Sequence, residues 1–324
     1  MNISEGDVGQ GPVTQDEPSR VRTLDDLKTW EFSGKALAVL GLPVAHSVSP
    51  QMHNAALNAM AQTHLIYRNW CYFKFEVPPE KLPEALPLFW EKGFHGLNLT
   101  IPHKVQAVDL VKEIDPAARS MGAVNTLTRL DGGGYNGNNS DGYGLETALE
   151  RELDVKIPGA DIVLLGAGGA ARAAAVQCLL KDCKSLWIGN RSQDRLNELI
   201  ALLDPKLVVE KVRGFDITNP PAELSAIEHP VIINATSLGL KADDPSPIDL
   251  SRFTGEAKIY DMTYGVKNAL ATQAEASGFA FADGLSMLVW QGVRSLEIWS
   301  NDTVPAQPMM SAACHAKGIE ARRA

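Results

Sequence analysis

A short polar segment after an expected strand carries the residues best placed for chemistry. Residues 96–100 are predicted to form a strand, and Asn98 and Thr100 lie two positions apart on it, so their side chains project from one face. Pro102 ends the ladder of backbone hydrogen bonds. Lys104 follows where a helix is expected to begin, and a lysine at such a corner beside a pocket is a candidate proton donor or acceptor.

A candidate partner, Asp141, ends a polar run that joins the two halves of the chain. An aspartate in this position commonly caps a helix, and that alternative stays open. The crevice between two α/β domains is also where ligands bind. If the fold brings Asp141 near Lys104, the two side chains form an acid–base pair.

Two hydroxyls follow the first expected strand. Ser47 and Ser49 alternate on one side of an extended segment, and Pro50 suits the first turn of a helix. The two serines are placed either to bind a carboxylate or to cap that helix.

A glycine-rich turn follows the strand expected at residues 161–165, with the sequence Gly166-Ala167-Gly168-Gly169-Ala170. Gly166 permits a tight turn, Gly168 lets a pyrophosphate approach the backbone, and Ala171 occupies the small third position of the dinucleotide fingerprint. Free N–H groups at the start of the next helix would bind the phosphates. In this strand–turn–helix context the pattern favours dinucleotide binding over a merely tight turn.

The next expected strand, at residues 185–189, runs into Asn190-Arg191-Ser192. An NAD-specific fold would place an acidic residue there. Arg191 and Arg195 instead offer guanidinium groups to a 2′-phosphate, unless both are simply surface arginines. The pattern favours NADP.

Alternating strands and helices must position these residues. From residue 36 onward, short apolar runs alternate with segments of helical period, which is typical of βαβ units and mainly parallel sheets. Residues 131–134 are expected to turn a hairpin after residues 124–130. Strands are expected at 36–40, 66–75, 96–100, 161–165, 185–189, 207–212, 231–234 and 258–262, and helices at 50–62, 79–92, 169–181, 192–203, 267–277 and 284–299.

The predicted fold class is therefore α/β, with an N-terminal α/β substrate domain and a Rossmann-like NADP-binding domain. The predicted divisions are a disordered polar tail at 1–22, a catalytic domain at 23–141, the NADP-binding domain at 142–282 and a helical return to the first domain at 283–324.

Composition excludes several classes of partner. With 30 Lys and Arg against 39 Asp and Glu, the net charge of −9 argues against nonspecific nucleic-acid binding. No apolar run reaches about 18 residues, so no membrane span is expected. The cysteines form no CxxC pair and no metal-ligand spacing with the histidines, a pattern typical of a reducing compartment. We expect a cytoplasmic protein without a metal.

Taken in order, these and further motifs resemble the shikimate dehydrogenase family from about residue 36 to 300. The motifs are Ser47-x-Ser49-Pro50, Asn98-x-Thr100 with Lys104, Gly122-Ala123-Val124-Asn125-Thr126, Asn139-Ser140-Asp141, the glycine turn, Asn190-Arg191-Ser192, Asn234-Ala235-Thr236-Ser237, Asp261-Met262-Thr263-Tyr264 and residues 283–291. The chain departs from the family pattern at Ser140, where threonine is usual, at Ser286, where glycine is common, and at Trp290, where a small residue is common.

The resemblance implies a role for each position. The substrate carboxylate would lie on Ser47 and Ser49, and Lys104 and Asp141 would form the catalytic pair. Tyr264 would lie near substrate and nicotinamide. Ring hydroxyls would meet Asn98, Thr100, Asn125, Asp141 and Gln291. The cofactor would be held by Gly166, Ala167, Gly168, Gly169, Ala170, Asn190, Arg191, Ser192, Arg195, Thr236, Met262 and Gly284.

The expected activity is the reversible, NADPH-dependent reduction of 3-dehydroshikimate to shikimate, in chorismate and aromatic amino-acid biosynthesis. A quinate or dual-specificity dehydrogenase is the main alternative. A folate-linked dehydrogenase is disfavoured by the paired serines, and a non-catalytic ligand sensor by the retention of Lys104 and Asp141. The expected partners are small molecules alone, with the chain a monomer or homodimer.

Overall fold

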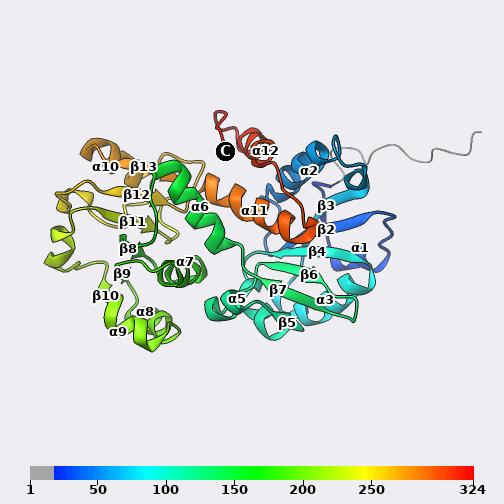
Figure 1. The fold of residues 1–324 in the computed structure, drawn as a ribbon, viewed down its shortest axis with the longest axis horizontal. Coiled ribbons are helices and arrows are strands. Elements are labelled where there is room, and N and C mark those ends of the chain that lie inside the picture. The colour runs from blue at the N-terminus through cyan, green and yellow to red at the C-terminus, as the bar shows by residue number, and fades with distance from the viewer. Residues whose placement is uncertain (1–17) are drawn as a thin grey trace, which may run out of the picture.

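The computed structural model describes residues 18–324, which form two α/β domains side by side (Figure 1). The first domain is built on a seven-stranded sheet in the order β1-β3-β2-β4-β6-β7-β5. Its strands are parallel except where β6 pairs with β4 and β7. They are β1 (Val21–Arg22), β2 (Lys35–Gly41), β3 (Trp70–Glu76), β4 (Phe94–Leu99), β5 (Glu113–Ile114), β6 (Thr126–Arg129) and β7 (Tyr135–Asn138).

The second domain contains a fully parallel six-stranded sheet in the order β10-β9-β8-β11-β12-β13. Its central strands are almost continuously apolar because helices cover both faces. The strands are β8 (Asp161–Leu165), β9 (Ser185–Asn190), β10 (Val212–Asp216), β11 (Pro230–Asn234), β12 (Lys258–Asp261) and β13 (Ala280–Asp283). The prediction of an α/β fold with mainly parallel sheets is confirmed.

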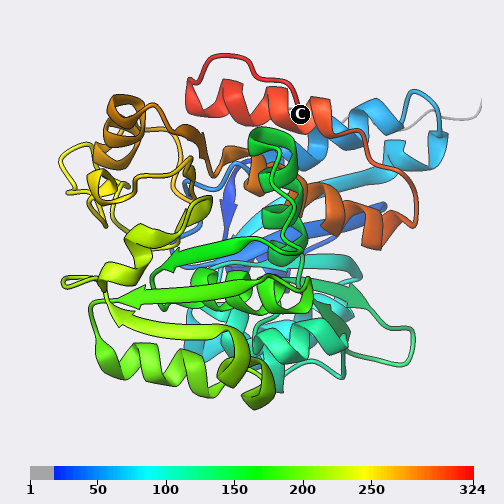
Figure 2. The ribbon, with the colours of Figure 1, turned by 60° about the vertical axis from the view of Figure 1, so that its left-hand side comes forward.

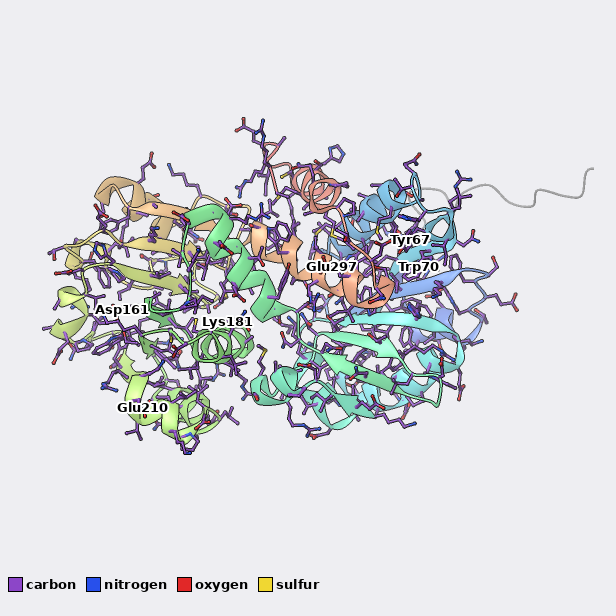
Figure 3. All side chains as sticks on the ribbon, in the orientation of Figure 1. Tyr67, Trp70, Asp161, Lys181, Glu210 and Glu297 are labelled. Atoms are coloured by element: carbon purple, nitrogen blue, oxygen red, sulfur yellow. The ribbon has the colours of Figure 1, made fainter. Side chains whose placement is uncertain are left out.

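Helices pack on both sheets and connect the domains. They are α1 (Leu24–Lys28), α2 (Ser49–Met60), α3 (Leu82–Glu91), α4 (His103–Gln106), α5 (Pro116–Met121), α6 (Asp141–Leu153), α7 (Gly169–Leu180), α8 (Gln193–Ala201), α9 (Pro205–Lys211), α10 (Ala269–Ser277), α11 (Leu285–Ser300) and α12 (Ala306–Lys317). In Figure 3, Tyr67 and Trp70 lie in the first domain, and Asp161, Lys181 and Glu210 lie in the second.

The chain crosses between the domains through α6 and returns through α11, and these two helices pack against each other (Figure 1). After α11, helix α12 packs on α2 of the first domain (Figure 2). The predicted boundary at 141/142 falls at the first turn of α6, and that at 282/283 falls at the end of β13. The domain boundaries themselves stay a prediction.

Two predicted strands are wrong in part. Residues 66–69 of the strand expected at 66–75 lie in the 3₁₀ helix Leu65–Asn69, because the pairing with β2 begins only where Trp70 faces Lys35. Residues 207–211 lie in helix α9, not in a strand. Asp204 accepts a hydrogen bond from the backbone N–H of Lys206, and Pro205 occupies the first helical position, so capping outweighs the strand preference of the valines in this segment.

The tail predicted to be disordered at 1–22 is also wrong at its end. Val21 and Arg22 form β1 beside β3, and the buried Arg22 guanidinium lies 4.9 Å from the ring centre of Phe73. Residues 1–17 of that predicted tail lie outside the described residues. Within the described part of the chain, no helix is long and apolar enough to cross a membrane.

Candidate active site

A cleft of about 720 Å³ lies between the domains and collects most of the predicted substrate residues. Its wall from the first domain includes Ser47, Ser49, Asn98, Thr100, Lys104 and Asp141. Its other wall includes Gly169, Ala170, Met262, Tyr264, Gly284 and Gln291. Asn125, Gly166, Ala167, Gly168, Asn190, Arg191, Ser192, Arg195 and Thr236 lie outside this lining.

Lys104 and Asp141 meet in the cleft. Lys104 Nζ donates to Asp141 Oδ2 at 2.7 Å, and the Asp141 side chain is 12% exposed. The other carboxylate oxygen, Oδ1, accepts a hydrogen bond of 2.9 Å from the buried amide of Asn125. Ser140, not Asp141, is the N-cap residue of α6. The alternative that Asp141 serves as a helix cap is therefore wrong, since its carboxylate is held by the first domain.

Ser47 and Ser49 form a pair of adjacent hydroxyls at the start of α2. Ser47 Oγ lies 3.2 Å from Ser49 Oγ and accepts a weak hydrogen bond from the Ser49 N–H at 3.3 Å. The N-cap residue of α2 is Val48, whose side chain makes no capping hydrogen bond, so apart from the Ser49 N–H the helix start has no side-chain cap and can receive an anion. Both hydroxyls line the cleft, as an anion-binding pair requires.

Asn98 has a buried side chain whose polar atoms all have protein partners. Its Oδ1 accepts from the Tyr72 hydroxyl at 2.8 Å, and its Nδ2 donates to Ser295 Oγ at 2.9 Å. Further acceptors are Asn125 O and Thr126 Oγ1. Asn98 therefore builds the wall of the cleft, and its contact with a ring hydroxyl stays a prediction.

The glycine turn leaves room for phosphate. Gly166 has φ +115°, and a Cβ there would lie 2.9 Å from Ala235 O, so only glycine fits without strain. A Cβ built on Gly168 or Gly169 would meet no atom within 4 Å. Gly168 is the N-cap of α7 and supplies no capping side chain, so the first N–H groups of this helix have no side-chain cap. The donor set and the space fit a pyrophosphate.

The other predicted cofactor residues lie at the carboxyl ends of neighbouring strands. Asn190 ends β9, and its amide donates to Ser192 O, while Ser192 caps α8. Arg191 and Arg195 are exposed, and within residues 18–324 neither guanidinium forms an ion pair or hydrogen bond. Thr236 follows β11, and its hydroxyl donates to Asn234 Oδ1 at 2.7 Å. The two free guanidinium groups suit a 2′-phosphate.

Sequence reasoning missed several residues of this region. Lys317, at the end of α12, lines the cleft with its Nζ 5.6 Å from the ring centre of Tyr264. The Tyr72 hydroxyl donates a hydrogen bond to Asn98 Oδ1 and so fixes the Asn98 side chain. Nothing in the sequence places α12 at the cleft, whereas an alternating pattern on β3 could have marked Tyr72 as facing the same side as Lys74.

His53, on α2, gives the fold a predicted pH dependence. It is fully buried, stacks on Tyr72 with ring centres 4.0 Å apart, and its Nδ1 donates to Ser49 O. Burial lowers the pKa of His53 to about 4 from 6.5. The unfolded chain therefore binds more protons between these values, so the stability that neutral His53 contributes is complete above pH 6.5 and is lost as pH falls to about 4.

We expect this histidine to account for about 3 kcal/mol of the acid loss in the free energy of unfolding. Urea unfolding across this pH range measures it. His53→Gln should flatten the dependence, whereas His229→Gln, at an exposed histidine, should leave it unchanged. An equally steep dependence in His53→Gln would assign the acid loss to other groups.

Comparison with known proteins identifies the family to which the chain belongs. The family model described as the shikimate dehydrogenase substrate binding domain matches residues 39–127, and that described as the shikimate 5′-dehydrogenase C-terminal domain matches residues 284–314. The shikimate dehydrogenase (NADP(+)) of Geobacter metallireducens is 36% identical over 278 residues, which cover 85% of this chain and 95% of that protein. The chain belongs to the shikimate dehydrogenase family.

Solved structures of shikimate dehydrogenases and related enzymes have the same two-domain fold. The shikimate 5-dehydrogenase of Thermus thermophilus, in complex with NADP(H) and shikimate, superposes with a TM-score of 0.75 at 30% identity, covering 87% of this chain and 99% of that one. The quinate dehydrogenase of Corynebacterium glutamicum, in complex with NAD, also gives 0.75, at 25% identity over 85% of this chain and 97% of that one.

Three positions depart from the usual shikimate dehydrogenase pattern. Ser140 is fully buried, and its hydroxyl lies 3.1 Å from Ser295 Oγ and 3.4 Å from Gln291 Oε1, so it retains the hydrogen-bonding function of a threonine. Ser286 is buried, and its Oγ has no partner among the described residues. Trp290 packs under the Arg151 guanidinium, 5.2 Å from its ring centre, and so joins α11 to α6.

Proposed function

We propose that this chain catalyses the reversible reduction of 3-dehydroshikimate to shikimate with NADP(H), a step of chorismate and aromatic amino-acid biosynthesis. The 2.7 Å contact between Lys104 Nζ and Asp141 Oδ2 carries the proposal. Both residues line the cleft, together with the Ser47–Ser49 hydroxyls and with Gly169 and Ala170 at the start of α7. Reduction of a ketone needs a hydride donor beside the carbonyl carbon and a proton donor beside the carbonyl oxygen, and Lys104 would be that proton donor.

The chain's own residues move the proton. When bound, NADPH would supply the hydride that the ring carbonyl carbon takes up. As the carbonyl oxygen becomes a hydroxyl, the Lys104 ammonium donates a proton to it, and in the reverse direction the neutral amine takes that proton back. Asp141 orients the ammonium by accepting its hydrogen bond, and Asn125 holds the carboxylate in place.

Substrate orientation comes from the first domain. Ser47 and Ser49 receive the carboxylate as neutral donors. Thr100, Gln291 and Asp141 face the ring hydroxyls, with Tyr264 closing the side toward the second domain. Held in this way, the ring presents its carbonyl to Lys104.

Cofactor binding falls to the second domain. The open space before Gly168 and Gly169 receives the pyrophosphate, and Arg191 and Arg195 receive the 2′-phosphate. Met262 and Gly284, which line the cleft, would hold the nicotinamide end near the substrate. The direct test is reduction of NADP⁺ by the purified chain in the presence of shikimate. Absence of turnover would overturn the proposal.

Quinate is the second candidate substrate, since one structural neighbour is a quinate dehydrogenase. Compared with shikimate, quinate carries one more ring hydroxyl and a saturated ring. Ser47 and Ser49 leave room for that hydroxyl but supply no further partner, and an unpaired buried polar group costs about 1–3 kcal/mol. We expect kcat/KM for shikimate to exceed that for quinate by at least about tenfold.

Parallel assays with the two substrates at one saturating NADP⁺ concentration measure this preference. Equal or faster turnover of quinate would replace the substrate assignment and leave the family membership intact.

A further inference from the structure

Lys74, on β3, is a buried lysine to which the proposed mechanism gives no task. It is 4% exposed, and within residues 18–324 no carboxylate lies within 4.0 Å of its Nζ. Burial lowers its pKa from the usual lysine value. Because a buried charge without a partner is costly, proteins normally pair or expose lysines. A ligand that supplies the missing negative charge would explain its position.

Two backbone carbonyls hold the Lys74 ammonium under the loop that leads into α2. Nζ donates to Ala45 O at 2.8 Å and, more weakly, to Ser47 O at 3.5 Å. An ammonium group has three donors, so these carbonyls leave one N–H without a protein acceptor. The cation therefore lies directly against the residue whose hydroxyl forms one half of the Ser47–Ser49 pair.

The sheet register places Lys74 on the side of the cleft. Lys74 pairs with Val39 across β3 and β2, and Val39 pairs with Asn98 across β2 and β4. Paired residues on neighbouring strands project from the same face. Val39 and Asn98 both line the cleft. Lys74 therefore projects from the same face of the sheet, one strand away from Val39, against the loop that carries Ser47.

The other charged side chains that the structure describes in the cleft do not supply a buried, unpaired positive charge for an anionic ligand. Among the described lining residues, Lys104 and Asp141 pair with each other, and Lys317 is exposed, so water screens its charge. Lys74 lies in a poorly solvated place, where an opposite charge interacts more strongly. The serine hydroxyls contribute donors and no charge.

We propose that Lys74 is the buried counter-charge and positioning residue of the carboxylate subsite. It holds the Ala45–Ser47 backbone in the conformation that presents Ser47, and its positive charge is balanced by the carboxylate of the substrate. The inference rests on the proposed function, because it takes shikimate as the ligand of that loop. It deepens that function by explaining how neutral serines select an anion.

The test separates charge from shape with two substrates. Shikimate and its uncharged methyl ester are assayed with wild type, Lys74→Met, Lys74→Arg and Lys317→Met. In Lys74→Met we expect KM for shikimate to rise about tenfold or more, which corresponds to about 1.4 kcal/mol. KM for the ester should change less than threefold, and kcat and KM for NADP⁺ should stay near wild type. Lys74→Arg should recover most of the affinity for shikimate.

Lys112→Met is the matched control, because Lys112 also donates to a backbone carbonyl, that of Gly132, at a distant hairpin. It should behave as wild type. If KM rises equally for shikimate and its ester in Lys74→Met, Lys74 is not the counter-charge. The assignment also fails if only Lys317→Met shows a rise in KM that is specific to the carboxylate. If wild type oxidises shikimate and Lys74→Met is unchanged, only this inference fails. If wild type does not oxidise shikimate, the proposed function fails.

A second measurement needs no variant, should Lys74→Met fail to fold. In a crystal structure of the wild-type chain with shikimate, we expect a carboxylate oxygen within about 6 Å of Lys74 Nζ, the range in which opposite charges stabilise each other. A carboxylate bound elsewhere in the cleft would overturn the inference.

Discussion

Lys104→Ala should lower kcat for shikimate oxidation by about 10²–10⁴-fold while KM changes little, because the ammonium acts on the oxygen mainly in the transition state. The substitution removes the donor that lies 2.7 Å from Asp141 and leaves Asp141 held by Asn125. Steady-state kinetics with varied shikimate at saturating NADP⁺ separates kcat from KM.

Binding of NADP⁺, followed by calorimetry, is the control, since Lys104 belongs to the first domain and the glycine turn to the second. An activity within threefold of wild type would remove Lys104 from the proton-transfer role. A loss confined to KM would make it a substrate-binding residue instead.

Arg191→Asp should reverse part of the cofactor preference. The exposed Arg191 follows directly after β9, and its guanidinium has no partner within the described residues, so it is free to meet a 2′-phosphate. A hydrogen bond to a charged group contributes about 1.5–3 kcal/mol, and the new carboxylate adds repulsion. We expect kcat/KM for NADP⁺ to fall about 10- to 100-fold or more, and that for NAD⁺ to stay level or rise.

Arg213→Asp provides a matched charge reversal, because Arg213 is also exposed but lies on β10 with its guanidinium on the carbonyl of Val212. It should leave the ratio of the two cofactors unchanged. Equal losses with NADP⁺ and NAD⁺ in Arg191→Asp would indicate that the arginine supports structure.

Local patterns predicted most of the fold because they have local causes. The strand before Gly166 is apolar on both faces, and the turn needs a positive φ that favours glycine, so periodicity and residue type agree there. Residues 207–211 misled the prediction because their valines suit a strand, while the cap at Asp204 lies outside the window that shows the pattern. Strand β1 is two residues long and exists only through its pairing with β3, which no local pattern reveals.

In the candidate site, too, the residues with local sequence signals were predictable and those positioned by distant contacts were not. Its polar residues stand in short motifs at strand ends, and parallel strands bring such ends to one edge, so the cleft between the domains was predictable. Lys74 was not, because its partners Ala45 and Ser47 belong to a distant loop. A lysine within the run Trp70–Glu76 is nevertheless a visible signal, since a charge in a strand buried on both faces needs a reason.

Asp141 stands where the chain passes from the first domain to the second. Asp141 is the first residue of the helix that crosses between the domains, yet its carboxylate is fixed by Lys104 and Asn125 on one side of that crossing. A rotation of the second domain about the start of α6 would change the gap between bound cofactor and substrate, and would leave the contacts of Asp141 with Lys104 and Asn125 in place. In the proposed mechanism, such a rotation would alter the hydride distance separately from the proton-transfer geometry. We therefore expect that exchanging the nucleotide-binding domain for one of different cofactor preference leaves the proposed acid–base chemistry intact.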